Sequence, residues 1–229
     1  MAQSAPTSAP DTNDMVIVHR VFRRELRLLP LLVEQAGADA EQIARVAAHA
    51  AEIFGALHHH HSGEDELLWP KLRARAELDD DLLDRMEAQH EQIGTLLTRA
   101  EQLFPAWAAA PAAEIADELV STMGQLCDAL DAHLAEEEAR ILPLTRVHLT
   151  AAEWGELGER GMASLPKDRL LVFLGYILEE ADEQERREFL AHVPLPGRLA
   201  YRMLGQRRYQ KEISVLRRGV PAPRGRVTT

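Results

Sequence analysis

The chain has 229 residues and a formal net charge of −11, with 37 acidic against 26 basic residues. Cys127 is its one cysteine, so an internal disulfide is excluded and a reducing, cytoplasmic setting is expected. No window approaches the roughly 20 apolar residues that a membrane span requires, and the acidic balance argues against nucleic-acid binding. Few aromatic residues and no alternating β-branched run predict an all-α fold.

Residues 1–13 are rich in Ser, Pro, Ala and Thr, a composition that predicts a disordered N-terminal arm. A first helix is expected from about Asp14 to Glu34, because its apolar residues recur at helical spacing. His19 shares the apolar face of this helix, and Pro30 is expected to bend or interrupt it. The first helix therefore offers one inward imidazole.

A second helix is predicted to begin near Asp39. Its apolar positions follow alternating steps of three and four, which is typical of a bundle core, and His60 and Glu64 lie on this inward stripe. His61 and Asp65 have the same i, i+4 spacing, but this competing pair lies one position off the stripe. We therefore prefer His60 with Glu64 as the inward pair.

The second half of this region repeats the arrangement. A third helix, expected at about 80–104, places His90 on its inward face, and Pro105 begins a predicted loop. A fourth helix, expected at about 112–147, carries a second inward His-x-x-x-Glu pair. Short connections between four helices predict an up-down four-helix bundle over residues 14–149.

The repeated His-x-x-x-Glu pattern is the feature that predicts function. At i, i+4 spacing the His and the Glu lie one above the other on a helix, so each copy offers one nitrogen and one oxygen ligand to the same point. Four imidazoles and two carboxylates suit a pair of iron ions bridged by the carboxylates, whereas structural zinc more often has thiolate ligands. The predicted metal ligands are His19, His60, Glu64, His90, His133 and Glu137.

Beyond the bundle, residues 150–196 predict a helical extension, which begins with the capping-box sequence of Thr150 and Glu153. Two roles are open for it: packing on the outside of the bundle, or forming a homodimer surface. Residues 197–229 form a basic helix and tail with nine Arg or Lys and one acid, Glu212. This tail either folds back onto the acidic bundle or contacts a polyanion or an anionic lipid.

No phosphate-binding Gly-rich loop, Ser/His/Asp set or paired Cys motif occurs, so hydrolase, kinase and zinc-finger functions have no support. Three further histidines have no acidic partner in the pattern and are predicted to be surface residues: His49, His148 and His192.

The order H, HxxxE, H, HxxxE, with the segments HHHHSGEDELLWPKL and HLAEEEARILPL, resembles the hemerythrin-like (HHE) family of non-haem di-iron proteins, and most closely its bacterial, actinobacterial-type branch. The similarity covers about Asp14 to Leu149. It implies that His19 and His60 bind one iron, that His90 and His133 bind the other, and that the two glutamates bridge an oxo- or hydroxo-bridged pair. The small-molecule ligand would be O2, peroxide or nitric oxide.

The resemblance has one departure. Oxygen-carrying hemerythrins have a further His one turn from the ligand of the third helix, and the corresponding positions here are Met86 and Gly94. Fewer protein ligands would leave open positions on the irons, which favours redox chemistry or sensing over reversible O2 storage. Reversible O2 or iron binding, and a signalling adaptor that responds to the state of the metal, are the alternatives.

Overall fold

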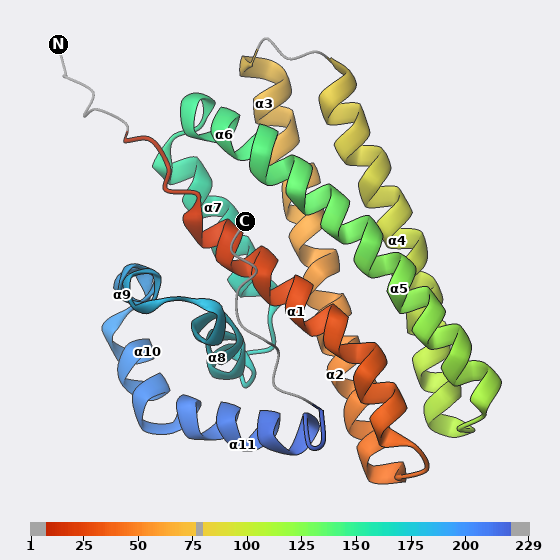
Figure 1. Cartoon of the computed structure of the whole chain (residues 1–229). Helices are drawn as coiled ribbons and strands as arrows, with labels where there is room; N and C mark the ends of the chain where they lie inside the picture. Colours follow the sequence, from red (N-terminus) through yellow and green to blue (C-terminus); the bar gives the residue numbers. More distant parts are fainter. Residues whose placement is uncertain (1–7, 77–79, 221–229) are drawn as a thin grey trace, which may run out of the picture.

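The computed structural model describes residues 8–76 and 80–220, and these contain helices and no strand, as the all-α prediction requires. The predicted disordered arm falls partly on residues 1–7, which lie outside the described residues. None of the described helices combines the length and the apolar character needed to cross a membrane. The bundle consists of four long helices (Figure 1): α1 (Asn13–Ala36), α2 (Ala40–Gly63), α4 (Asp80–Ala109) and α5 (Ala113–Glu136).

The four helices form a closed square, because α1 and α4 each pack against both α2 and α5. The α2 helix begins as predicted, and the side chain of Asp39 accepts hydrogen bonds from the backbone amides of Glu41 and Gln42. One boundary prediction is wrong, because α4 continues through Pro105 to Ala109. The buried Trp107, packed against Phe104, gives these last turns an apolar contact that offsets the proline.

The two helices that carry a His-x-x-x-Glu motif each continue into a π-helical turn that begins at the Glu of the motif. In α2 this turn, η1 (Glu64–Leu68), leads into α3 (Trp69–Arg75), and in α5 the turn η2 (Glu137–Ile141) leads into α6 (Leu142–His148). Each π-turn holds one residue more than an α-helical turn, so the positions that face the core shift by one residue after it. Leu68 is therefore buried, whereas Leu67 is only partly buried.

The apolar core of the bundle is divided into two clusters, with the predicted ligands between them. On each helix the predicted ligands lie between a residue of the larger cluster and a residue of the smaller one. The flanking residues of the larger cluster are Val21, Leu57, Ile93 and Leu130, and those of the smaller cluster are Met15, Leu68, Met86 and Ile141. A polar layer therefore crosses an otherwise apolar core.

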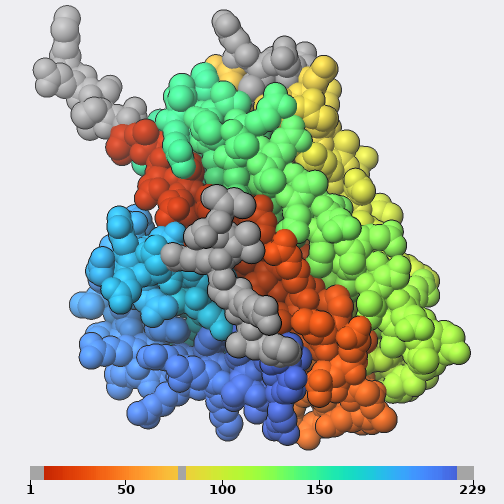
Figure 2. Space-filling view, in the orientation of Figure 1, coloured from red at the N-terminus to blue at the C-terminus, as the bar shows by residue number. Residues whose placement is uncertain are grey.

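The C-terminal helices pack on the side of the bundle formed by α1 and α2, away from α4 and α5 (Figures 1 and 2). The predicted capping box is confirmed, with Thr150 and Glu153 bonded reciprocally. α7 contacts α2, α8 contacts α1, and α11 contacts both α8 and α2. The segments are α7 (Ala151–Ser164), α8 (Leu170–Glu180), α9 (Glu183–His192), α10 (Leu195–Ala200), the π-turn η3 (Tyr201–Gly205) and α11 (Gln206–Leu216).

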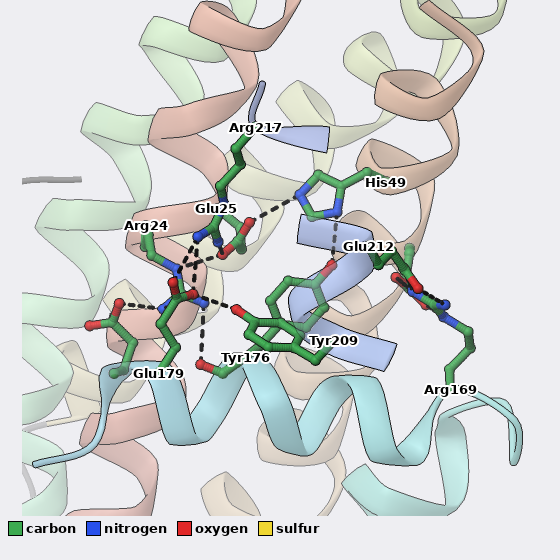
Figure 3. Close-up of polar contacts among 11 residues, drawn as sticks. Arg24, Glu25, His49, Arg169, Tyr176, Glu179, Tyr209, Glu212 and Arg217 are labelled. Carbon is green, nitrogen blue, oxygen red and sulfur yellow. Dashed lines mark hydrogen bonds and ion pairs between the residues drawn. The ribbon is translucent and has the colours of Figure 1, made fainter. Parts of the chain in front are cut away.

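A buried polar cluster, here called the Glu25 cluster, joins the C-terminal helices to the bundle (Figure 3). The carboxylate of Glu25 pairs with Arg24 at 2.5 Å, with Arg217 of the tail at 2.7 Å, and with Nε2 of His49 at 3.1 Å. The hydroxyl of Tyr176 donates to Nδ1 of His49 at 3.2 Å. The prediction of His49 as a surface residue is wrong, because the C-terminal helices cover it.

Candidate metal centre

The structure brings all six predicted ligand residues into the polar layer of the bundle. His19, His133 and both glutamates are fully buried, and the side chain of His60 is only 10% exposed. The ligand atoms form two groups, and within each group all of the atoms lie within 4.8 Å of one another. The first group contains His19, His60, Glu64 and Glu137, and the second contains His61, Glu64, His90 and His133.

The two carboxylates lie between imidazoles of both groups. One oxygen of Glu64 is 3.2 Å from Nε2 of His60, and the other is 3.5 Å from Nε2 of His90. Oε2 of Glu137 is 3.4 Å from Nε2 of His19 and 3.8 Å from Nε2 of His133. Glu64 belongs to both groups and Glu137 only to the first, yet each faces an imidazole on either side.

Hydrogen bonds on the opposite ring nitrogen orient three of the imidazoles. Nδ1 of His19 lies 2.9 Å from Glu138, and Nδ1 of His90 lies 2.7 Å from Asp65. Nδ1 of His133 lies 3.0 Å from the side-chain oxygen of Gln89. An oxygen acceptor places the proton on Nδ1, which leaves the Nε2 lone pair directed to the centre.

These anchoring carboxylates repeat with the motif. Asp65 directly follows Glu64, and Glu138 directly follows Glu137, so each motif carries a glutamate for the centre and an acid that orients a histidine of another helix. Asp65 also accepts a hydrogen bond from the indole of Trp69 at 2.8 Å. The duplication seen in the sequence thus extends to the residues that orient the imidazoles.

The sequence pattern favoured His60 over His61, but the structure places His61 in this centre as well. Its ring stacks on His90, with centroids 4.2 Å apart and planes at 18°, and meets His133 edge-on at 5.2 Å. Its buried Nε2 has no hydrogen-bond partner. The apolar stripe of α2, with its steps of three and four, predicts one inward residue per turn. In the structure two adjacent histidines of α2 face inward, His60 in the first group and His61 in the second. The i, i+3 spacing from His61 to Glu64 was the signal that could have identified it.

We call these seven residues the histidine–glutamate cluster: His19, His60, His61, Glu64, His90, His133 and Glu137. None of the four carboxylate oxygens accepts a hydrogen bond from the described residues. Burial, reinforced by the neighbouring Glu137, raises the pKa of Glu64 well above its ordinary value, and burial also raises the pKa of Glu137.

The imidazoles shift in the opposite direction, since burial disfavours their cationic form. Burial and the neighbouring histidines lower the pKa values of His60 and His61 well below the ordinary value, and lower that of His133 to about 2. Neutral imidazoles are the form that ligates metals, and carboxylates without a countercharge require a cation. The nearby Arg23 does not supply it, because its guanidinium pairs with Glu138 and Asp131. The donor set therefore fits a metal pair.

The fold and this donor set define a four-helix bundle protein with a buried cation site. The family model of the hemerythrin HHE cation binding domain matches residues 11–146, which is more than half of the chain. The chain belongs to this family, as the paired motifs indicated. Neither the comparison with curated proteins nor the comparison with solved structures found a match.

Proposed function

We propose that the histidine–glutamate cluster binds two iron ions and that the protein binds or reduces O2, peroxide or nitric oxide at this pair. The observation that carries the proposal is the pair of buried carboxylates, which accept no hydrogen bond from the described residues and lie between imidazoles of two groups. Each group offers two or more imidazoles and a carboxylate, a mixed nitrogen and oxygen set that suits iron. Family membership supports cation binding, and the choice of iron follows from this donor chemistry.

Within this proposal, His19, His60 and Glu137 hold one ion, and His61, His90 and His133 hold the other. Glu64 is shared by both groups and bridges them. His61 supplies a fifth imidazole, which Met86 and Gly94 cannot provide. Fewer coordination positions on the ions are therefore left open than the six predicted ligands alone imply.

An iron pair held by these residues would supply redox chemistry with O2, peroxide or nitric oxide, and an external reductant would return it to the ferrous state. The chain orients the imidazoles through their Nδ1 partners and separates the centre from bulk water. The ring of Phe22 lies 5.2 Å from that of His60, and the ring of Trp69 lies 5.7 Å from that of His90. Both aromatic side chains are buried, so they shield the histidine–glutamate cluster from bulk water on these two sides.

The first test is to purify the protein with ferrous iron, count metal per chain, and record the near-ultraviolet and visible spectrum before and after peroxide. Two irons per chain with a spectrum that responds to peroxide support the proposal. A folded, helical protein that takes up no iron contradicts it. Repeated cycles of oxygenation and deoxygenation separate turnover from the alternative of reversible binding, because a carrier returns to its starting spectrum without consuming a reductant.

Alanine substitutions test the ligand assignment. We expect Glu64→Ala and Glu137→Ala to lose iron stoichiometry, and His61→Ala to fall from two irons towards one. The matched control is His59→Ala, since His59 is an exposed neighbour on the same helix and should retain both irons. Equal iron loss in all of these variants would contradict the assignment, and full retention in His61→Ala would remove that residue from it.

A further inference from the structure

Large apolar side chains gather on the exposed side of α10 and η3. Leu195, Leu199, Met203 and Leu204 are between 51% and 69% exposed. The first three recur in steps of four, which places them along one side of the helix. Single exposed leucines are normal on protein surfaces, but a contiguous set of this kind marks an interaction surface.

The same segment is strongly basic. Between Leu195 and Lys211 the sequence contains no acidic residue. Its five cations are all exposed, and among the described residues only Arg208 contacts an acid, Asp168. The other four form no ion pair with a described residue: Arg198, Arg202, Arg207 and Lys211. We call these four cations and the four apolar side chains the basic apolar patch.

The opposite side of this segment is already packed. A Cβ at Gly205 would lie 3.1 Å from Leu171 at the start of α8, and a Cβ at Gly175 of α8 would lie within 2.3 Å of the Tyr209 ring. Ile213 of α11 is also buried. Figure 1 shows α10 meeting α11 at a bend that projects from the side of the molecule away from α4 and α5. The patch therefore lies on a protruding corner.

We propose that the basic apolar patch docks on an anionic lipid surface. Helices that lie in the membrane interface combine leucine-type side chains, which insert among the lipids, with Arg or Lys, which pair with anionic headgroups. A convex corner suits a flat bilayer, whereas an extended peptide needs a groove. This proposal does not depend on the identity of the metal.

The charge of the patch disfavours the homodimer that the sequence left open for the C-terminal extension. A two-fold dimer pairs one patch with its own copy, so Arg198, Arg202 and Arg207 would face like charges across the interface. The acidic bundle is repelled by an anionic membrane, but salt screens this repulsion over about 8–10 Å at physiological ionic strength. A patch at a protruding corner reaches the lipid while the bundle remains farther away.

The test is co-sedimentation of the iron-loaded, full-length protein with sucrose-loaded vesicles. Vesicles of phosphatidylcholine alone are compared with vesicles that contain about one third phosphatidylglycerol, at low salt and at high salt. We expect at least fivefold more bound protein on the anionic vesicles at low salt, and loss of most of this binding at high salt. Leu199→Glu with Met203→Glu, and separately Arg202→Glu, should each reduce the bound fraction about tenfold.

The matched control is Leu31→Glu with Val147→Glu, which adds the same two negative charges at exposed apolar residues outside the patch and should bind as the unmodified protein does. Circular dichroism and iron content confirm that each variant is folded. Absence of binding to anionic vesicles, equal binding to both vesicle types, or binding that persists in Leu199→Glu with Met203→Glu would overturn the proposal. A dimer that these substitutions convert to a monomer, without vesicle binding, would assign the patch to self-association instead.

Discussion

Among the described residues, carboxylates are buried in two places, and their pKa values shift in opposite directions. In the Glu25 cluster the carboxylate pairs with Arg24, Arg217 and His49. Burial alone would raise the pKa of Glu25, but the hydrogen bond from His49 and the charge of Arg24 lower it to about 2. In the histidine–glutamate cluster burial raises the pKa of Glu64, and the neighbouring carboxyl group of Glu137 raises it further.

The difference shows how a structural charge is distinguished from a ligand. When the positive partners of a buried carboxylate are side chains of the same protein, folding alone completes the ion pair. Such a pair joins the helices that carry its members. A buried carboxylate whose neighbours are other metal-ligating groups is completed by a cation from solution. In this protein the Glu25 cluster joins α1, α2, α8 and the residue after α11. The histidine–glutamate cluster lies inside the bundle.

The largest expected effect comes from replacing one glutamate of each cluster, Glu25 or Glu64, by glutamine. Glu25→Gln should lower the free energy of unfolding of the metal-free protein by roughly 3–5 kcal/mol, because the guanidinium groups of Arg24 and Arg217 each lose their fully buried carboxylate partner, and it should retain two irons. Glu64→Gln should lose iron and leave the metal-free stability unchanged or higher. Urea unfolding after chelation, together with metal analysis, measures both effects. Equal destabilisation by the two substitutions would mean that Glu64 is also a structural charge.

Iron itself should stabilise the fold nearly as much. At a free iron concentration 1,000 times the dissociation constant, binding adds about 4 kcal/mol to the free energy of unfolding. The Glu25→Gln variant should gain the same increment, because the two clusters share no residue and should act additively. Thermal unfolding with and without iron measures the gain. A gain that disappears in Glu25→Gln would show that the clusters are coupled.

Much of this fold could be predicted from sequence, because apolar residues at helical spacing define the four bundle helices. The two His-x-x-x-Glu motifs and the inward histidines of the other two helices identified six members of the histidine–glutamate cluster, and the structure places all six together. The π-turns were not predictable, since i, i+4 spacing between His60 and Glu64 fits an uninterrupted helix equally well. His61 was ranked below His60 because a heptad pattern selects one face of the helix. His49 was wrongly predicted to be a surface residue because the sequence does not show that the C-terminal helices bury it.

Acid should remove the contribution of the Glu25 cluster. The ordinary pKa of a glutamate is 4.5, and in the folded protein that of Glu25 is about 2. Its contribution is therefore complete above pH 4.5 and is lost as the pH falls towards 2, in total about 3 kcal/mol. The difference in stability between the metal-free unmodified protein and Glu25→Gln should shrink across this window. Comparing these two proteins cancels the titration of the histidine–glutamate cluster, and a constant difference would contradict the assigned pKa.

The smallest effect tests the residues that orient the imidazoles. Asp65→Asn and Glu138→Gln retain a similar side-chain shape but remove the charge beside Nδ1 of His90 and His19. Iron affinity should fall about 10–100-fold, while the helix content remains unchanged. Glu66→Gln is the matched control, because Glu66 adjoins Asp65 yet pairs only with Arg160 at the surface. Competition with a chelator of known affinity measures the loss. If Asp65→Asn binds iron as tightly as Glu66→Gln, packing alone orients His90, and Asp65 has no role in tuning the centre.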